Sequence, residues 1–543
     1  MRQRIATAAG LIMLGNIASR LLGVVREQVI AALFGTTGTT DAFVAAATVP
    51  TMVYDLLIGG AISAALIPVF ADYADRQDEL WRVASTVINL VLGVLVIAVA
   101  VLVIFAPQLM GVLATGLPAE KQAQAVLLVR LVLPAVLFLG LSAVTTALLY
   151  AQQRFALPAF AVALYNLGLI VVAVLFAGRL GVVSLALGLL VGALAQVALQ
   201  LPGLRAMRYS LRLELNHPGV RQILALYAPV ALGLLVTQAQ VVIDRHLASQ
   251  TGEGSMATMR FATTLVQFPL GLVGTAMSLA ILPTLARYAT RAKGNQEAGS
   301  RESGNQGNSK FEIRNSDFCS SALDDFKRTL ATGLKLTLLL ILPATVGLVV
   351  LRLPLIELLF QHGVFGAAST QRTALAFLCY SPSIPFAAID LLLVAAFYAR
   401  KNTLVPALYV ASFGVLIYLA VALSLIGPLG MPGLVLANSA YWTAHAIVLF
   451  GLLWREIGGL WGYGLARAAI KTLVAALVMG VTVAAVGPLL GRWLPLAGLR
   501  GVAVWLGVAT ALGIVVYAAA VALLRVEEAG AIVAMVRKRL GAT

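Results

Sequence analysis

Apolar runs long enough to cross a lipid bilayer recur along the whole sequence. Of the 543 residues, 61% are hydrophobic and only 11% are charged. A soluble domain carries about 25% charged residues, and a helix of roughly 20 apolar residues spans the hydrocarbon core of a bilayer. The sequence therefore predicts an all-α polytopic membrane protein with about fourteen transmembrane helices, and it excludes a soluble enzyme with a single anchor.

The distribution of basic residues predicts how these spans are oriented. If the N-terminus is cytoplasmic, most of the 38 lysines and arginines fall in cytoplasmic segments, as the positive-inside rule requires. This places both termini in the cytoplasm. It also accounts for much of the net charge of +16, so we expect no nucleic-acid partner. The predicted spans lie near residues 8–34, 41–70, 83–106, 125–150, 157–177, 181–203, 219–248, 257–289, 329–350, 369–399, 403–426, 431–454, 464–488 and 499–524.

An internal repeat relates the two halves of the chain. SAALIPVFADY at residues 63–73 aligns with SLAILPTLARY at 278–288, and Pro134 in span four aligns with Pro382 in span ten. An even number of spans separates the members of each pair, so both copies have the same orientation in the membrane. Such parallel repeats are typical of several transporter folds, and they favour alternating access around a central cleft.

The repeat predicts a domain organisation. Spans one to six form an N-terminal lobe at residues 1–218, and spans seven to twelve form a second lobe at 219–462. Residues 463–543 add two further helices and a basic tail. The polar interval at 293–326 is rich in Gly, Asn and Ser, so we expect a mobile cytoplasmic loop. Prolines such as Pro50, Pro134, Pro269 and Pro382 predict bent helices.

Ionisable side chains within the first two spans are candidate functional residues, because charges at membrane depth are costly. Arg20 and Glu27 are seven positions apart and share one helical face, with Arg26 beside them. The guanidinium fork matches phosphate oxygens, so these residues can line a site for an anionic headgroup such as a pyrophosphate. The alternative is a set of internal salt bridges, Arg20 with Asp55 or Arg26 with Asp41, that holds the two spans together.

Two further acidic residues are candidates for ion coupling. Asp244 either coordinates a coupling cation or pairs with Arg245 or Arg260. Asp390 has no evident partner in its own helix, which makes it a candidate proton or cation site. We interpret His445 as a packed core histidine. No catalytic or metal-ligand spacing accompanies these residues, so we predict a transporter without a resident cofactor, coupled at most to a cation such as Na⁺ or H⁺.

Several motifs together resemble one known family. ASRLLGVVREQVIAALFGTTGTTDAF, GAISAALIPVFADY, VQFPLGLVGTAMSLAILPTLARY and FYARKNTLVPAL are similar to the MurJ (MviN) family of lipid II flippases, in the multidrug/oligosaccharidyl-lipid/polysaccharide exporter superfamily. The resemblance implies two six-helix lobes plus two C-terminal helices. It implies transport of an undecaprenyl-pyrophosphate-linked muropeptide, lipid II, across the bacterial cytoplasmic membrane for cell-wall synthesis. We expect membrane lipid as the only other partner, and a monomer.

The same resemblance implies which residues bind the substrate. Arg20 and Arg26 match the family's pyrophosphate contacts, Asp41 matches a functional position, and the last two helices contribute a groove for the lipid tail. The sequence lacks other charges that the family pattern carries, and Arg260 lies one turn before an expected arginine, so it is placed to supply the second-lobe cation. The positions without the expected charge are Thr48, Tyr54, Asp55, Gly59, Thr263, Thr264 and Gln267.

Three other functions remain open on the sequence. One is a flippase for a different polyprenyl-linked glycan, and another is a drug or cation antiporter of the same superfamily. An antiporter for cations predicts a net acidic cavity, whereas the first span contributes Arg20 and Arg26 against Glu27. The third is a relative that only scaffolds cell-wall enzymes, for which both arginines are dispensable.

Overall fold

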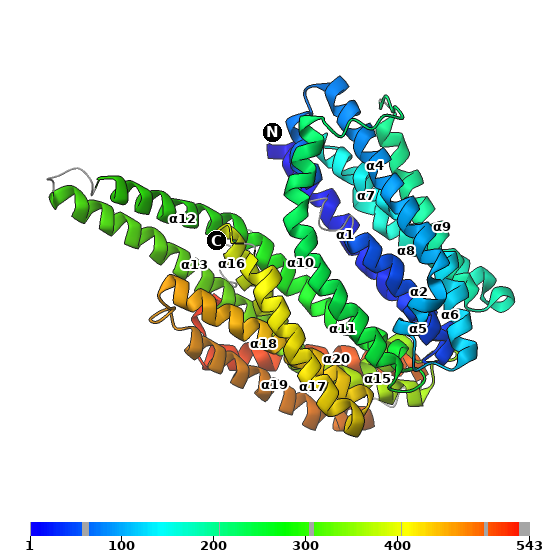
Figure 1. Ribbon diagram of the computed structural model, residues 1–543. Coiled ribbons are helices and arrows are strands. Elements are labelled where there is room, and N and C mark those ends of the chain that lie inside the picture. The colour runs from blue at the N-terminus through cyan, green and yellow to red at the C-terminus, as the bar shows by residue number, and fades with distance from the viewer. Residues whose placement is uncertain are drawn as a thin grey trace. The chain divides into compact units, whose positions relative to one another are not determined.

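The computed structural model is helical, with no strand in the residues that it describes (Figure 1). The helices divide into two compact units, Met1–Phe261 with Phe360–Ser369 and Ala262–Leu359 with Thr370–Thr543. The residues described are 2–56, 65–205, 207–302, 309–402, 404–493 and 498–530.

The first unit contains most of the N-terminal half of the chain. Its helix α11 (Ser255–Pro269) begins in this unit and ends in the second. The other elements of the first unit are α1 (Arg2–Phe34), α2 (Gly38–Tyr54), α3 (Ile67–Asp72), α4 (Gln77–Ile104), α5 (Ala106–Leu113), α6 (Ala119–Val132), α7 (Ala135–Ala151), α8 (Ala156–Leu180), α9 (Val183–Gln200), the 3-10 turn η3 (Leu201–Leu204) and α10 (Pro218–Ser249).

The second unit contains the C-terminal helices. α13 packs against α12, α16 and α19, and α20 packs against α19. Leu330, Phe326 and Leu392 belong to its core. Its elements are the π-helical turn η4 (Leu270–Gly274), α12 (Thr275–Glu302), α13 (Ser309–Val350), α14 (Arg352–Phe360), α15 (Ala367–Tyr380), α16 (Ser383–Ala399), the π-helical turn η5 (Val405–Val410), α17 (Ala411–Leu429), α18 (Met431–Ile457), α19 (Leu465–Trp493) and α20 (Gly498–Leu523).

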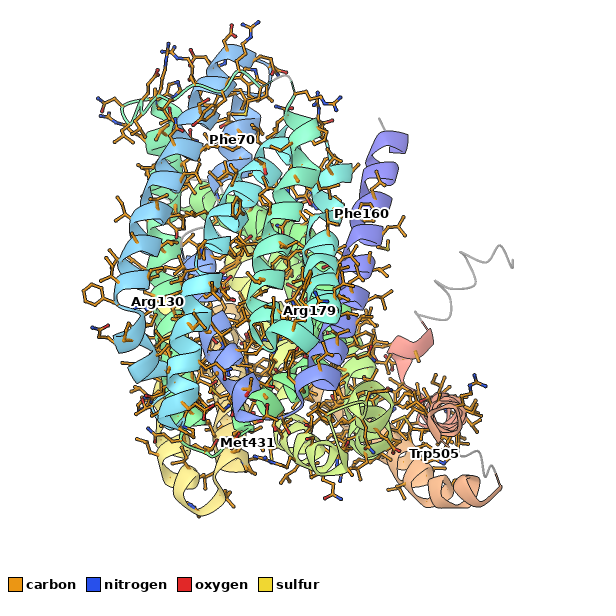
Figure 2. The ribbon with its side chains drawn as sticks, turned by 90° about the vertical axis from the view of Figure 1, so that its right-hand side faces the viewer. Phe70, Arg130, Phe160, Arg179, Met431 and Trp505 are labelled. Carbon is orange, nitrogen blue, oxygen red and sulfur yellow. The ribbon has the colours of Figure 1, made fainter. Side chains whose placement is uncertain are left out.

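Glycines bring α8, α9 and α1 into close contact in the first unit. A Cβ atom at Gly192 of α9 would lie 2.4 Å from the carbonyl oxygen of Tyr165 on α8. A Cβ atom at Gly15 of α1 would lie 2.2 Å from the carbonyl oxygen of Ala159, also on α8. Small residues allow membrane helices to approach backbone to backbone. α1 therefore lies directly along α8 (Figure 2), and α8 is fixed in turn by α9.

The apolar helices confirm a polytopic membrane protein. Ten helices in the described residues are long and apolar enough to cross a membrane, and twelve result if each of two bent helix pairs is one span. The predicted spans at 8–34 and 41–70 are not among them. α1 contains five charged residues, three of them within the predicted span 8–34, and α2 has only 17 residues. The total of fourteen spans stays a prediction.

Two prolines that the predicted repeat pairs both lie at helix breaks. Pro134 precedes α7 and Pro382 precedes α16, each as the residue before the helix. α15 and α16 meet at 46°, which confirms the predicted bend at Pro382. Pro269 ends α11 just before η4, whereas α2 continues past Pro50 to Tyr54. Proline has no N–H to donate, so a bend at such a point costs little.

Helices α12 and α13 correct the prediction of a loop across 293–326. α12 continues to Glu302 and α13 begins at Ser309, so most of this polar interval has helical backbone. A helix that has already formed gains one hydrogen bond for each residue it adds, and Ala, Glu, Lys, Arg and Gln favour that extension. Residues 303–308 lie outside the described part. The mobility of the interval and the lobe boundaries near residues 218 and 462 stay predictions.

Candidate functional site

The buried carboxylate of Glu27 lies between two guanidinium groups. Arg260 of α11 donates from Nε to Oε2 and from Nη2 to Oε1, both at 2.8 Å. Arg26 donates from Nη2 to Oε1 at 2.7 Å and from Nε at 3.1 Å. The side chain of Glu27 is 3% exposed, compared with 24% for Arg26 and 21% for Arg260. We call these three residues the arginine cluster.

Asn166 of α8 fixes the orientation of Arg26. Its Oδ1 accepts a hydrogen bond from Nη1 of Arg26 at 2.9 Å, and its Nδ2 donates to the carbonyl oxygen of Ser19 at 3.2 Å. The amide thus holds α1 at two points almost two helical turns apart. The guanidinium carbon of Arg260 lies 5.6 Å from the centroid of the Phe43 ring, in a cation–π contact.

The arginine cluster is net cationic. An isolated carboxylate at this depth would be costly, and the bidentate bonds from Arg260 offset that cost. One negative charge meets two positive charges, so the cluster has one positive charge in excess. Because both arginines remain partly exposed, the cluster is suited to attract phosphate or carboxylate oxygens.

Arg20 and Asp55 do not form the salt bridge that was the alternative interpretation. Arg20 is exposed and has no hydrogen bond or ion pair with any described residue. Asp55 caps the C-terminal end of α2, is half-buried, and likewise has no ion pair within the described ranges. Arg20 thus adds a second accessible positive charge to α1, six residues before Arg26.

Asp41 and Glu253 cap each other's helices. Asp41 lies in the first turn of α2, and its two carboxylate oxygens accept hydrogen bonds from the backbone N–H groups of Gly254 at 2.6 Å and Ala257 at 2.7 Å, at the start of α11. Glu253, just before α11, accepts a bond of 2.9 Å from the N–H of Gly38, the first residue of α2. Both carboxylates satisfy N–H groups that have no partner within their helix, and both lie at the positive end of a helix dipole.

Other contacts close the same end of the first unit. The N–H of Val364 donates to the carbonyl oxygen of Ala32 at 2.9 Å, and the hydroxyls of Thr36 and Ser369 share a hydrogen bond of 2.6 Å. Phe261 packs against two phenylalanines of the segment Phe360–Ser369, with ring centroids 5.4 and 5.6 Å apart. The ends of α1, α2 and α11 therefore meet in one hydrogen-bonded and aromatic cluster.

Asp390 in the second unit has a partner from a neighbouring helix. Its Oδ1 lies 2.6 Å from Nδ1 of His445 on α18, and both side chains are buried. The ring of Tyr441 stacks on His445 at 5.7 Å, and Trp442 contacts it edge-on at 6.3 Å. His445 is a core residue, as predicted, but it is hydrogen-bonded to a carboxylate.

Asp244 is paired within its own helix, which was one of the two predicted alternatives. Its Oδ2 lies 3.5 Å from Nη1 of Arg245, and its side chain is 16% exposed. No cluster of three or more His, Cys, Asp and Glu side chains that could hold a metal occurs in the described part of the chain.

An apolar cavity of about 450 Å³ lies in the second unit. Hydrocarbon side chains from α13, η4, α19 and α20 form its walls, and it has almost no polar lining. Such a cavity suits an acyl or polyprenyl chain. Residues from each wall include Leu272, Leu348, Met479, Val483, Leu506 and Ile514.

Comparison with known proteins decides the family. The sequence model of the family described as "Lipid II flippase MurJ" matches residues 30–501. The chain belongs to the lipid II flippase MurJ family. It is 31% identical to the "Lipid II flippase MurJ" of Burkholderia cenocepacia, over 80% of this chain and 81% of that protein. It is 28% identical to the "Probable lipid II flippase MurJ" of Haemophilus influenzae, over 94% and 98% of the two chains.

Solved structures confirm the fold. A structure titled "Lipid II flippase MurJ, inward closed conformation" superposes with a TM-score of 0.75 at 21% identity, covering 94% of this chain and 98% of that one. An inward-facing multidrug resistance MATE family transporter of the MOP superfamily superposes less closely, with a TM-score of 0.57 at 16% identity, covering 81% and 95%. The protein is thus a multi-pass member of the MurJ family, and its fold is similar to those of both solved structures.

Arg260 is the residue by which this MurJ family member departs from the pattern expected at the start of span eight. The expected arginine position is Thr264, one helical turn later, and Arg260 instead reaches Glu27. That Arg260 replaces the arginine expected at Thr264 stays a prediction. Gly59, another position without its expected charge, lies outside the described residues.

The sequence did not identify two residues of the site, Asn166 and Glu253. Asn166 lies in an apolar span, where a single amide is also typical of helix packing. Glu253 lies in the polar turn TGEGS, where an acidic residue just before a helix is an ordinary capping signal. That signal predicts a cap on α11 itself, whereas Glu253 caps α2.

Glu27→Gln should destabilise the folded protein by about 3–5 kcal/mol, because it leaves two neighbouring guanidinium groups without their shared carboxylate. Thermal unfolding in detergent, followed by the intrinsic tryptophan signal, measures the effect. Arg20→Gln is the matched control, and it should change stability by less than about 0.5 kcal/mol since Arg20 is exposed and unpaired. Equal stability of the two variants would contradict the role assigned to Glu27.

Asp41→Ala should loosen the start of α11. Two backbone N–H groups lose their acceptor, which costs roughly 1–3 kcal/mol for each buried donor. Hydrogen–deuterium exchange of peptides that cover residues 254–257 should therefore accelerate, whereas Asp55→Ala should leave these peptides unchanged. Unaltered exchange in Asp41→Ala would show that the carboxylate is not the cap.

Proposed function

We propose that this protein flips lipid II, an undecaprenyl-pyrophosphate-linked muropeptide, from the inner to the outer leaflet of the bacterial cytoplasmic membrane. The observation that carries the proposal is the family match across residues 30–501, which includes α11 with Arg260 and begins shortly after Glu27 in α1. The basic residues of the predicted cytoplasmic segments support an orientation with both termini inside.

The arginine cluster and Arg20 supply the site for the pyrophosphate. Glu27 holds the guanidinium groups of Arg26 and Arg260 in place. The two side chains therefore lose little conformational entropy when the substrate binds. The charge in excess on the cluster, together with Arg20, matches the anionic pyrophosphate. Glu27 is thus a positioning residue, and the three arginines are the binding residues.

Asp41 holds together the starts of α2 and α11, which close one end of the first unit. Both of its carboxylate oxygens bind backbone N–H groups of α11, so they are not directed to a substrate. Opening of this end of the first unit separates α2 from the start of α11 and breaks the reciprocal caps. Alternating access then requires that these hydrogen bonds exchange with water.

The apolar cavity of the second unit accommodates part of the undecaprenyl tail. The tail comes from the hydrocarbon of the bilayer, so the cavity holds it by van der Waals packing and not by removing it from water. The headgroup and the tail of one substrate thus meet two chemically different sites. Another polyprenyl-linked glycan would use the same two sites, and the muropeptide is preferred here because the matched relatives carry lipid II in their names.

The Asp390–His445 pair is the site proposed for a coupling proton. Na⁺ requires several oxygen ligands, whereas this pair offers one carboxylate hydrogen-bonded to an imidazole, a combination suited to holding a proton. The ring of Tyr441 stacks on His445 and adds a phenol hydroxyl to the surroundings of the pair. Asp244, already paired with Arg245, is the alternative coupling residue.

Complementation of a bacterium depleted of its own lipid II flippase tests the substrate and the cluster. The wild-type protein should restore growth, and Arg26→Ala should not. The alanine removes charge-assisted hydrogen bonds worth roughly 1.5–3 kcal/mol each, or about tenfold or more in flipping. Arg26→Lys should restore growth partially if charge alone matters, and hardly at all if bidentate geometry does.

Arg179→Ala, at the exposed end of α8, is the matched control and should restore growth fully. Absence of rescue by the wild-type protein, despite its insertion in the membrane, would rule out lipid II. Rescue by both Arg20→Ala and Arg26→Ala would rule out the cationic site and favour a scaffold. Export of cationic drugs without rescue would identify an antiporter.

A pH gradient across proteoliposomes tests the proton site. Flipping by the wild-type protein should rise when the gradient is imposed, and this rise should be lost in Asp390→Asn and in His445→Gln. Basal flipping without a gradient, measured in parallel, controls for misfolding. A response that is lost in Asp244→Asn but kept in both of the other variants would move the coupling site to α10.

A further inference from the structure

The linker between α9 and α10 exposes a row of large apolar side chains. Residues 207–214 have no regular secondary structure, and Tyr209, Leu211, Leu213 and Leu215 are all exposed. The ring of Tyr209 lies along the protein surface, because its hydroxyl donates to Oδ1 of Asn89 on α4. The exposed fractions are 53% for Tyr209, 87% for Leu211, 63% for Leu213 and 48% for Leu215. A water-exposed connection rarely places four such residues together, so the row indicates a contact with an apolar phase.

Side chains of α4 hold the backbone of this linker. The Nδ2 of Asn89 donates to the carbonyl oxygens of Ser210 at 3.0 Å and Arg212 at 2.9 Å. The N–H of Ser210 donates to Oγ of Ser85 at 3.2 Å. The side of the linker that faces α4 therefore carries much of its polar backbone and the hydroxyl of Tyr209, and the leucines of the row are left exposed.

The depth of these contacts is informative. Ser85 and Asn89 lie two to three turns into the candidate membrane span Gln77–Ile104, and within the predicted span 83–106. A non-helical backbone at that depth needs partners for its polar groups, because lipid provides none. The hydrogen bonds to Ser85 and Asn89 meet that need, and they leave the leucines directed to the surroundings of the protein.

Basic residues accompany the apolar row. Arg208 is 84% exposed and Arg212 is 63% exposed, and Arg205 lies at the start of the linker. Both arginines form only long ion pairs with the described residues. Nη1 of Arg208 lies 3.8 Å from Oδ1 of Asp78, and Nη1 of Arg212 lies 3.8 Å from Oε1 of Glu214. Arginines beside leucines and a tyrosine match the boundary between acidic headgroups and hydrocarbon.

We propose that the α9–α10 linker binds the surface of a bilayer leaflet rich in anionic lipid. Tyr209, Leu211, Leu213 and Leu215 insert at the edge of the hydrocarbon, and Arg208 and Arg212 bind acidic headgroups. That the leaflet is the cytoplasmic one rests on the topology proposed above, whereas lipid binding itself does not. A protein strand is disfavoured as the occupant, because Asn89 already engages the carbonyl groups of Ser210 and Arg212.

The test uses the full-length protein in vesicles. In a background with Cys319→Ser and Cys379→Ser, Leu211→Cys is labelled with an environment-sensitive fluorophore. Asp75→Cys, an exposed position in the turn before α4, is the matched control. The vesicles contain phosphatidylcholine alone or with phosphatidylglycerol, and either lipid is brominated in turn to quench fluorophores that touch it.

The label at residue 211 should be quenched by brominated lipid and protected from iodide in water, with the reverse at residue 75. Brominated phosphatidylglycerol should quench it more than brominated phosphatidylcholine. Each of Arg208→Gln and Arg212→Gln should lower that preference about fivefold. Quenching of residue 211 by iodide alone would overturn the insertion, and equal quenching by the two lipids would overturn headgroup recognition. Both readouts are independent of flipping, so loss of lipid II transport does not affect the result.

Discussion

Glu27 lies in the interior of a predicted membrane span, and its carboxylate is held there by the guanidinium groups of Arg26 and Arg260. The three side chains come from two helices, and Asn166 joins a third. Because Asn166 also binds the backbone of α1, the position of Arg26 follows that of α8. The close contact between α8 and α9 at Gly192 then keeps this frame stiff. A charge that membrane insertion disfavours is thus retained by a support that extends through four helices.

Much of the architecture follows from simple features of the sequence. Long apolar runs leave only helices as spanning elements, because each backbone N–H and C=O must be paired within its own segment. The charged residues of α1 could be identified as candidates because they interrupt a long apolar run. α1 and α2 are not among the ten helices found long and apolar enough to cross a membrane, because α1 carries charges within its apolar run and α2 has only 17 residues. Composition did not predict the helical backbone of the polar interval, because it reports whether a segment can be buried, and a solvent-exposed helix needs no burial.

The partners of the site residues were harder to predict. Asp41 binds the backbone of Gly254 and Ala257, and a backbone N–H carries no signature in the sequence. Asp390 and His445 lie on different helices, so neither periodicity nor spacing connects them. Arg260 could be predicted as a candidate because it lies at the start of span eight, where the repeat pairs it with Asp41 and the family pattern expects an arginine nearby. Its contact with Glu27 required the folded chain.

The reciprocal caps of α2 and α11 have a kinetic meaning. Asp41 lies on α2 and accepts from α11, while Glu253 precedes α11 and accepts from α2. Separation of the two helix starts breaks the bonds of both carboxylates at once, although α2 keeps the local cap from Thr37. A latch of this kind resists partial opening and yields only when all of its bonds are replaced by water. The first unit should therefore pass between closed and open states abruptly, with a short-lived intermediate, and the lifetime of the closed state should depend on both carboxylates at once.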